Sequence, residues 1–259
     1  MSEVRGLHSR SGRRKAGRFA VEGPQSVRSA VAAGVVIHDL FVDEGTGGVF
    51  SDIVDAVESL GGHVAWTTAE VMAALSETRT PQGIVAVCDL LATGDADSLM
   101  AADGPVVVLE AVSDPGNVGT IIRTADAIGA AGVILTPESA DVHNGKVVRS
   151  TAGSLFHLPI VAGLPLNAVV ASAAAHGRTV AVASGEADTD LFAAARTGRI
   201  DARTCWVIGS EAHGVSAEAR ELADVLVAIP MVGRAESLNA AVAASVVLYV
   251  SAFTSQLGP

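Results

Sequence analysis

Aromatic side chains are scarce in this sequence: phenylalanine, tryptophan and tyrosine together make up 3% of the 259 residues. Some sheet proteins bind nucleic acid by stacking its bases on rows of exposed aromatics. We do not expect this mode of binding here. Cysteine is also rare, and Cys88 and Cys205 each stand alone inside a strand-like run. Neither has the spacing of a metal ligand or of a disulfide framework, so we expect both to be core residues in a reducing cytoplasm.

Two common nucleotide-binding signatures are missing as well. The chain contains neither a G-x-G-x-x-G triplet nor a G-x-x-x-x-G-K-[ST] loop, which argues against a Rossmann oxidoreductase and a P-loop enzyme. The N-terminus is charged and has no apolar core, so it does not read as a secretory signal. The uncharged stretch 238–259 is interrupted by polar residues, which predicts a buried helix and no membrane span.

Positive charge is concentrated at the start of the chain. The protein has a net charge of −11, whereas residues 1–28 hold seven Lys or Arg against two Glu. A basic segment ahead of an acidic body is typical of proteins that bind nucleic acid, although a solvated tail would show the same pattern. We expect residues 1–18 to form a basic flexible arm.

Strand-like and helix-like segments alternate along the rest of the chain, which predicts α/β layers. Residues 19–92 form one small α/β domain in this interpretation, with helices that begin at Pro24, Ser51 and Thr68. Residues 93–104 are small, acidic and glycine-containing, as is typical of a linker. Beyond them, continuous apolar runs such as "VVVL" predict a parallel sheet in a domain spanning 105–259, with ligands bound beyond the carboxyl ends of its strands.

Three loops that follow strand-like runs combine glycine with polar residues. They are "DPGNVGTIIRTA" (114–125), "IGSEAHGVS" (208–216) and "IPMVGRAESLNAAVAAS" (229–245). In this order they resemble motifs 1, 2 and 3 of the SpoU (TrmH-like) RNA 2′-O-ribose methyltransferases, and "VVRSTAGSLFHLPI" (147–160) fits the segment between motifs 1 and 2. The stretches "FAVEGPQSVRSAV" and "TPQGIVAV" resemble, more loosely, an N-terminal L30e-like RNA-binding domain.

The resemblance implies an α/β fold in which a small L30e-like domain precedes a parallel-sheet α/β-knot (SPOUT) domain with a deep trefoil knot. It also implies S-adenosylmethionine as cofactor, RNA as partner and a homodimer formed through the knotted domain, with no metal and no membrane. Ribosomal RNA is the preferred substrate because of the L30e-like half. Transfer RNA, and a non-catalytic role in RNA binding or ribosome assembly, remain alternatives.

The matched motifs assign five candidate catalytic residues: Arg123, Asn117, Glu211, Ser237 and Asn239. Because a guanidinium stays protonated, we expect Arg123 to hold a nucleotide phosphate and stabilise the 2′-oxyanion rather than act as a base. The alternative is a surface arginine paired with Asp126. Asn117 and Ser237 would also serve as helix N-caps, and Glu211 would otherwise be part of a polar turn.

The resemblance also assigns residues to the cofactor and to RNA. It assigns cofactor binding, mostly through backbone groups, to Gly209, Ile229 and Leu238. The assignment of Ser184 and Ala183 to the cofactor is weaker. The candidate RNA-binding residues are Arg149, Arg13, Arg14, Lys15 and Arg18. Arg149 would otherwise be a helix-surface arginine. The basic arm would supply the phosphate contacts that the acidic body lacks.

Overall fold

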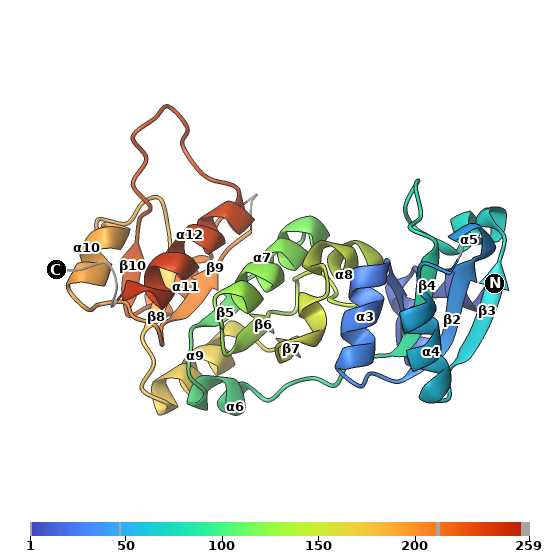
Figure 1. The fold of residues 1–259 in the computed structure, drawn as a ribbon. Helices are drawn as coiled ribbons and strands as arrows, with labels where there is room; N and C mark the ends of the chain where they lie inside the picture. Colours follow the sequence, from blue (N-terminus) through green and yellow to red (C-terminus); the bar gives the residue numbers. More distant parts are fainter. Residues whose placement is uncertain (1, 47, 211–212, 255–259) are drawn as a thin grey trace. The chain divides into compact units, whose positions relative to one another are not determined.

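The computed structural model describes residues 2–46, 48–210 and 213–254, and the chain divides into two compact units (Figure 1). Unit 1 contains the chain up to Ala92 together with Asp141–His157. Unit 2 contains Thr93–Ala140 and the chain from Leu158 onward. The α/β fold with a separate N-terminal α/β unit, predicted from the sequence, is confirmed.

Unit 1 is built on a four-stranded sheet with the order β1-β4-β2-β3. β4 runs antiparallel to β1 and β2, while β2 and β3 are parallel. The strands are β1 (Arg18–Glu22), β2 (Ile37–Asp43), β3 (His63–Thr67) and β4 (Ile84–Asp89). The helices are α1 (Ser2–Gly6), α2 (Arg10–Ala16), α3 (Pro24–Ala32), η1 (Glu44–Thr46), α4 (Ser51–Ser59), α5 (Ala69–Leu75), α8 (Gly145–Thr151) and η2 (Ser154–Phe156).

The three predicted helix starts in this unit are found, although one cap differs. Pro24 is the first residue of α3, where its missing N–H costs no hydrogen bond. Thr68 caps α5 by accepting from the backbone N of Val71. Ser51 is the first residue of α4 and not its predicted N-cap, because Phe50 occupies the cap position without a side-chain hydrogen bond.

Residues 2–17 fold as α1 and α2 instead of the flexible arm that the charge pattern predicts. Val4 and Leu7 are buried in a small apolar cluster, and Ser9 caps α2. The side chain of Arg13 is only 3% exposed, and it donates to the carbonyl of Leu7 at 2.8 Å and to Asp141 at 2.7 Å. Two apolar residues and one buried ion pair thus make this basic segment part of the fold.

The segment Asp141–His157 packs in unit 1 although unit 2 flanks it on both sides in the sequence. Arg149 on α8 forms ion pairs with Glu22 at 2.6 Å and with Glu77 at 3.4 Å. His143 packs edge-on against Phe19, with ring centroids 4.8 Å apart. The chain consequently passes between the two units three times, after residues 92, 140 and 157.

The Arg13–Asp141 pair makes the stability of unit 1 dependent on pH. Burial alone would raise the pKa of Asp141, but hydrogen bonds from His143 and Arg13 outweigh it and hold this pKa well below its usual range. A lowered folded-state pKa contributes stability that is present above about pH 4 and lost as the pH falls further. We expect Asp141→Asn to lower the free energy of unfolding by about 2 kcal/mol at pH 7, and by less near pH 3.

Urea unfolding at the two pH values measures this effect. Asp52→Asn is the matched control, because it breaks the solvent-exposed Arg28–Asp52 pair, and such pairs contribute little. Equal losses for both variants at pH 7 would contradict a special contribution from Asp141.

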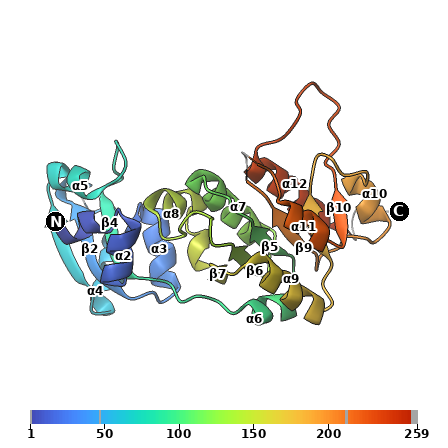
Figure 2. The same ribbon diagram turned by 180° about the vertical axis from the view of Figure 1, so that it is seen from behind.

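Unit 2 contains a six-stranded, entirely parallel sheet with the order β10-β8-β9-β5-β6-β7 (Figure 2). The strands are β5 (Val106–Leu109), β6 (Gly132–Leu135), β7 (Ile160–Ala162), β8 (Val180–Ala183), β9 (Cys205–Ile208) and β10 (Val225–Val227). The helices are α6 (Ala96–Ala101), α7 (Pro115–Ala127), α9 (Leu166–Ala175), α10 (Leu191–Arg196), α11 (Ala217–Leu222) and α12 (Ala240–Ala252). The predicted parallel sheet is confirmed, whereas the trefoil knot stays a prediction.

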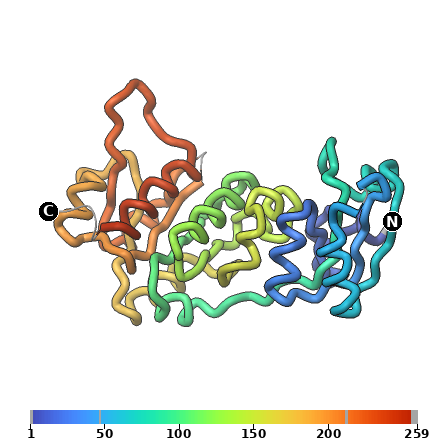
Figure 3. The backbone as a smooth tube through the Cα atoms, in the orientation of Figure 1, coloured from blue at the N-terminus to red at the C-terminus, as the bar shows by residue number. Residues whose placement is uncertain are grey.

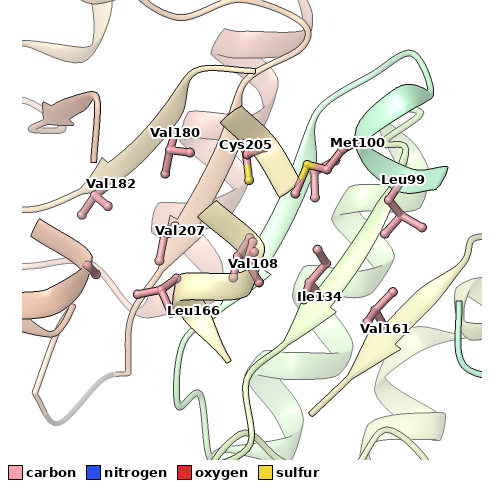
Figure 4. Packing of buried hydrophobic residues seen from close by; sticks show 14 of the residues in the cluster. Leu99, Met100, Val108, Ile134, Val161, Leu166, Val180, Val182, Cys205 and Val207 are labelled. Atoms are coloured by element: carbon pink, nitrogen blue, oxygen red, sulfur yellow. The ribbon is translucent and has the colours of Figure 1, made fainter. Parts of the chain in front are cut away.

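Both faces of this sheet are covered by helices. On one face, alternate strand residues such as Val108 and Cys205 pack with α6, α9 and α11 (Figure 4). The intervening residues point to the opposite face, on which α7 contacts β6 and α12 contacts β9. Burial raises the pKa of both the Cys88 and the Cys205 thiol to about 12, in keeping with the predicted core role of the cysteines.

Residues 93–104, which we expected to be a linker, contain the helix α6. Asp95 caps this helix by accepting from the backbone N of Ser98 at 2.9 Å. Leu99 and Met100 are buried in the core of unit 2. Their apolar side chains hold the segment against the sheet.

Arg178 closes the C-terminal end of α6 from a buried position. Its side chain is only 3% exposed. It donates to the carbonyls of Met100 at 2.7 Å, Gly104 at 2.8 Å and Arg203 at 2.7 Å, and also to those of Leu99 and Ala102. Helix ends leave carbonyls without partners, and here one guanidinium satisfies several of them.

The closing helix α12 is shorter than a membrane span. None of the helices in the described part of the chain combines the length and apolar character that crossing a bilayer requires.

Candidate functional site

A cavity of about 290 Å³ opens in unit 2 at the carboxyl ends of β8, β9 and β10. These three strands are neighbours in the sheet, so the loops that leave them converge. The five residues that the sequence assigns to the cofactor all line this cavity: Ala183, Ser184, Gly209, Ile229 and Leu238. Residues from three separate segments of the chain thus lie at one cavity.

In the loop that follows β9, the described residues on either side of positions 211–212 lie close together. The backbone N of Gly214 donates to the carbonyl of Ser210 at 2.8 Å. A Cβ atom at Gly209 would lie 2.2 Å from the carbonyl oxygen of Gly214, so only glycine fits there. Glu211 lies outside the described residues, and its role stays a prediction.

Helix α7 begins three residues earlier than its motif suggests. Asp114 is its N-cap and accepts from the backbone N of Asn117 at 3.0 Å, while Pro115 is its first residue. The prediction of Asn117 as N-cap is therefore wrong. The signal was present in the sequence, because Asp followed by Pro is a strong start for a helix.

The start of α12 is also shifted. Asn239, not Ser237, is its N-cap, and its Oδ1 accepts from the backbone N of Ala241 at 2.9 Å and of Val242 at 3.3 Å. Ser237 precedes the helix and lines the cavity. The cap position depends on the backbone path into the helix, which a "SLN" sequence does not specify.

A hydrogen bond joins the two helix starts. The Nδ2 of Asn239 donates to the Oδ1 of Asn117 at 3.1 Å, while the other end of the Asn239 amide caps α12. Further along the same two helices, the hydroxyls of Thr124 and Ser245 are 3.1 Å apart. The candidate catalytic asparagines therefore form one hydrogen-bonded pair between α7 and α12.

Arg123 lies on α7 but does not line the cavity. It is exposed together with Thr120 and Ala127, three before it and four after it on the same helix face. Asn117 and Thr124 face α12 instead. The structure thus places Arg123 on a solvent-facing stripe of α7.

The cavity walls are mostly apolar or backbone. Among the described residues that line it, Glu236 alone is charged. It belongs to the connection between β10 and α12, a long excursion of the chain in Figure 3. Such a lining suits an uncharged or cationic ligand better than a polyphosphate. Sequence reasoning missed Glu236, Gly185 and Gly214, because nothing local distinguishes a cavity wall from a turn or core residue.

The candidate RNA-binding residues of unit 1 have different environments. Arg14 and Lys15 are exposed on α2, and Arg18 is half-buried at the start of β1. The guanidinium of Arg13 is buried and forms an ion pair with Asp141, so the predicted contact of Arg13 with RNA does not fit the structure. A phosphate that approached Arg149 would have to compete with the two glutamates that already hold it.

Comparison with known proteins identifies the family. The SpoU rRNA Methylase family matches residues 104–249, which is more than half of the chain. The chain belongs to the SpoU rRNA methylase family. An MRM3-like substrate binding domain matches residues 1–86, ahead of the methylase region.

Relatives of similar length support this membership. The chain is 34% identical over 246 residues to 23S rRNA (guanosine(2553)-2′-O)-methyltransferase RlmP of Bacillus subtilis, covering 94% of this chain and 92% of the relative. It is 36% identical to the 23S rRNA (uridine(2479)-2′-O)-methyltransferase of Streptomyces viridochromogenes, covering 94% and 85%. The crystal structure of the SpoU methyltransferase AviRb from Streptomyces viridochromogenes, in complex with the cofactor AdoMet, superposes with a TM-score of 0.85 at 30% identity, covering 99% and 98%.

Proposed function

We propose that this protein transfers the methyl group of S-adenosylmethionine to a ribose 2′-hydroxyl of 23S ribosomal RNA. The observation that carries the proposal is the convergence of all five predicted cofactor residues on one cavity, in a chain whose full-length relatives are 23S rRNA 2′-O-methyltransferases. Ribosomal RNA is favoured over transfer RNA by the substrates named for those relatives.

The cavity suits S-adenosylmethionine in size and lining. Its volume of about 290 Å³ is near the lower end for small-molecule sites. Backbone groups at Gly209 and Ile229 would bind the adenosine part, and the Glu236 carboxylate would favour a cationic ligand. When bound, the cofactor supplies an electrophilic methyl group.

The exposed stripe of α7 would receive the target nucleotide. Arg123 would hold a phosphate of this nucleotide through its two-pronged guanidinium and stabilise the negative charge that develops on the 2′-oxygen. The Asn117–Asn239 pair would orient the ribose beside the cavity. Holding the hydroxyl in line with the methyl group supplies much of the rate.

Two measurements test the function. Calorimetry should show one S-adenosylmethionine site per chain, and its absence at millimolar cofactor would favour a non-catalytic RNA-binding protein. Mapping of 2′-O-methyl marks in RNA from cells with and without the gene should reveal one nucleotide of 23S rRNA that loses its mark. A lost mark in transfer RNA instead would refute the proposed substrate.

Gly209→Ala should weaken S-adenosylmethionine binding at least about ten-fold. The new Cβ would collide with the backbone of Gly214 and Val215, which cannot move without displacing the cavity wall. Gly233→Ala is the control, since a Cβ there would meet open space and Gly233 does not line the cavity. Calorimetric titration of both variants measures the difference, and equal affinities would refute this use of the loop.

We propose that the enzyme is a homodimer that buries one face of α12. Val242, Tyr249 and Phe253 are exposed at spacings that place them on one side of the helix, and the rings of Tyr249 and Phe253 stack with centroids 5.9 Å apart. Such an apolar stripe suits a second copy of the same surface. Tyr249→Arg should shift the mass measured by light scattering from dimer to monomer, and an unchanged dimer would place the interface elsewhere.

A further inference from the structure

One glutamate contacts the residues on either side of the loop after β9, of which Gly209, Ser210, Gly214 and Val215 line the cavity. Glu110 directly follows β5, and its backbone N donates to the carbonyl of Ile208, the last residue of β9, at 2.9 Å. Its carboxylate accepts two hydrogen bonds from Ser216, one from the backbone N at 3.0 Å and one from Oγ at 2.5 Å. Because the loop lies between Ile208 and Ser216, Glu110 ties its two ends together.

Ser216 is itself anchored to the body of unit 2. It is the N-cap of α11, and its Oγ accepts from the backbone N of Ala219 at 3.0 Å. Ala219 is buried in the core cluster beneath the sheet. The carboxylate of Glu110 therefore connects the end of β5, the end of the loop and the first turn of α11.

The chain next to Glu110 is held in a costly conformation. Ala111 has a φ of 52°, in the left-handed region that disfavours residues with a Cβ atom. Its backbone N donates to the Oγ1 of Thr136 at 3.0 Å, which helps to hold this turn. Strain of this kind persists only where the surrounding structure holds it, which indicates that the turn next to Glu110 is well defined.

We propose that Glu110 is a positioning residue for cofactor binding, which acts through Ser216 to hold residues 209–210 and 213–215 at the cavity. Gly209, Gly214 and Val215 of this loop line the cavity, whereas Glu110 does not. The inference rests on the proposed function, because S-adenosylmethionine is the ligand whose affinity it governs. Removing the hydrogen bonds between Glu110 and Ser216 would leave the cavity-lining residues themselves unchanged. It would only make their positions less well defined.

The test uses the full-length protein and calorimetric titration with S-adenosylmethionine. Ser216→Asp keeps a good N-cap for α11 but sets a second carboxylate against Glu110. We expect it to raise the Kd about five-fold, as Glu110→Ala should too. Adding Glu110→Gln to Ser216→Asp should bring the Kd back within about two-fold of the wild type, since the new amide can donate to the new carboxylate.

Asp97→Ala is the matched control, because it removes another carboxylate that accepts from a serine hydroxyl, Ser172 Oγ at 2.5 Å, away from the cavity. It should leave the Kd unchanged. In steady-state assays the weakened variants should show a raised KM for S-adenosylmethionine with kcat nearly unchanged at saturation, a split that a general loss of stability does not produce.

Equal Kd values for wild type and Ser216→Asp, or no recovery in the double variant, would overturn the inference while the wild type still binds. Failure of the wild type to bind S-adenosylmethionine would instead overturn the proposed function, and the inference with it. Should Glu110→Ala fail to fold, Ser216→Asp and its double variant decide the question alone.

Discussion

Arg123→Ala is expected to reduce methyl transfer by about a hundred- to a thousand-fold while the Kd for S-adenosylmethionine stays within about two-fold of the wild type. Removing one donor that stabilises an oxyanion has an effect of this size. The cofactor affinity should survive because Arg123 is exposed on α7 and does not line the cavity. Single-turnover transfer of a labelled methyl group to unmodified 23S rRNA measures the rate.

Two further variants make this result specific. Arg123→Lys keeps the charge but not the planar fork, so it should recover only part of the rate. Arg196→Ala removes another exposed helical arginine of unit 2 and should change nothing. A near-normal rate for Arg123→Ala would leave Arg123 as the surface residue that the sequence alone also allows.

The largest expected loss of stability follows from Arg178→Ala, at about 3–5 kcal/mol. Burial lowers the pKa of Arg178, and its guanidinium is held by hydrogen bonds to five backbone carbonyls. Truncation would leave several of these carbonyls buried without donors. Denaturant unfolding measures the change in the free energy of unfolding.

Arg178→Met separates hydrogen bonding from packing, because it keeps an apolar stem of similar length without any donor. We expect it to lose nearly as much stability as Arg178→Ala. Arg203→Ala, on an exposed neighbour, should have little effect. A loss below 1 kcal/mol for both Arg178 variants would show that water can replace the guanidinium.

The alternation of strands and helices was predictable because each strand of unit 2 is a short run of apolar and often β-branched residues. The residues at which helices begin were harder to predict. The segment around residue 114 offers both Asp114 and Asn117 as caps, and Pro115, directly after Asp114, was the signal that favoured the first of them. No such signal marks α12, where the choice of Asn239 over Ser237 depends on the backbone path into the helix.

Long-range pairs left no local signal. Arg13 stands among basic residues that suggest a solvated arm, yet its partner Asp141 lies 128 positions further along the chain. Glu110 and Ser216 are separated by 106 positions and were equally invisible. The cavity residues were predictable only through the three motifs, since an apolar wall residue such as Ile229 looks the same as a core residue.

The placement of Asp141–His157 in unit 1 bears on how the protein can be divided for expression. A fragment that begins after Ala92 would keep this segment but lose the strands and helices that cover it. Val147, Val148 and Leu155, buried in the whole protein, would then face solvent. Such a fragment would aggregate or be cut by proteases within the segment, so the methylase region is better studied in the intact chain.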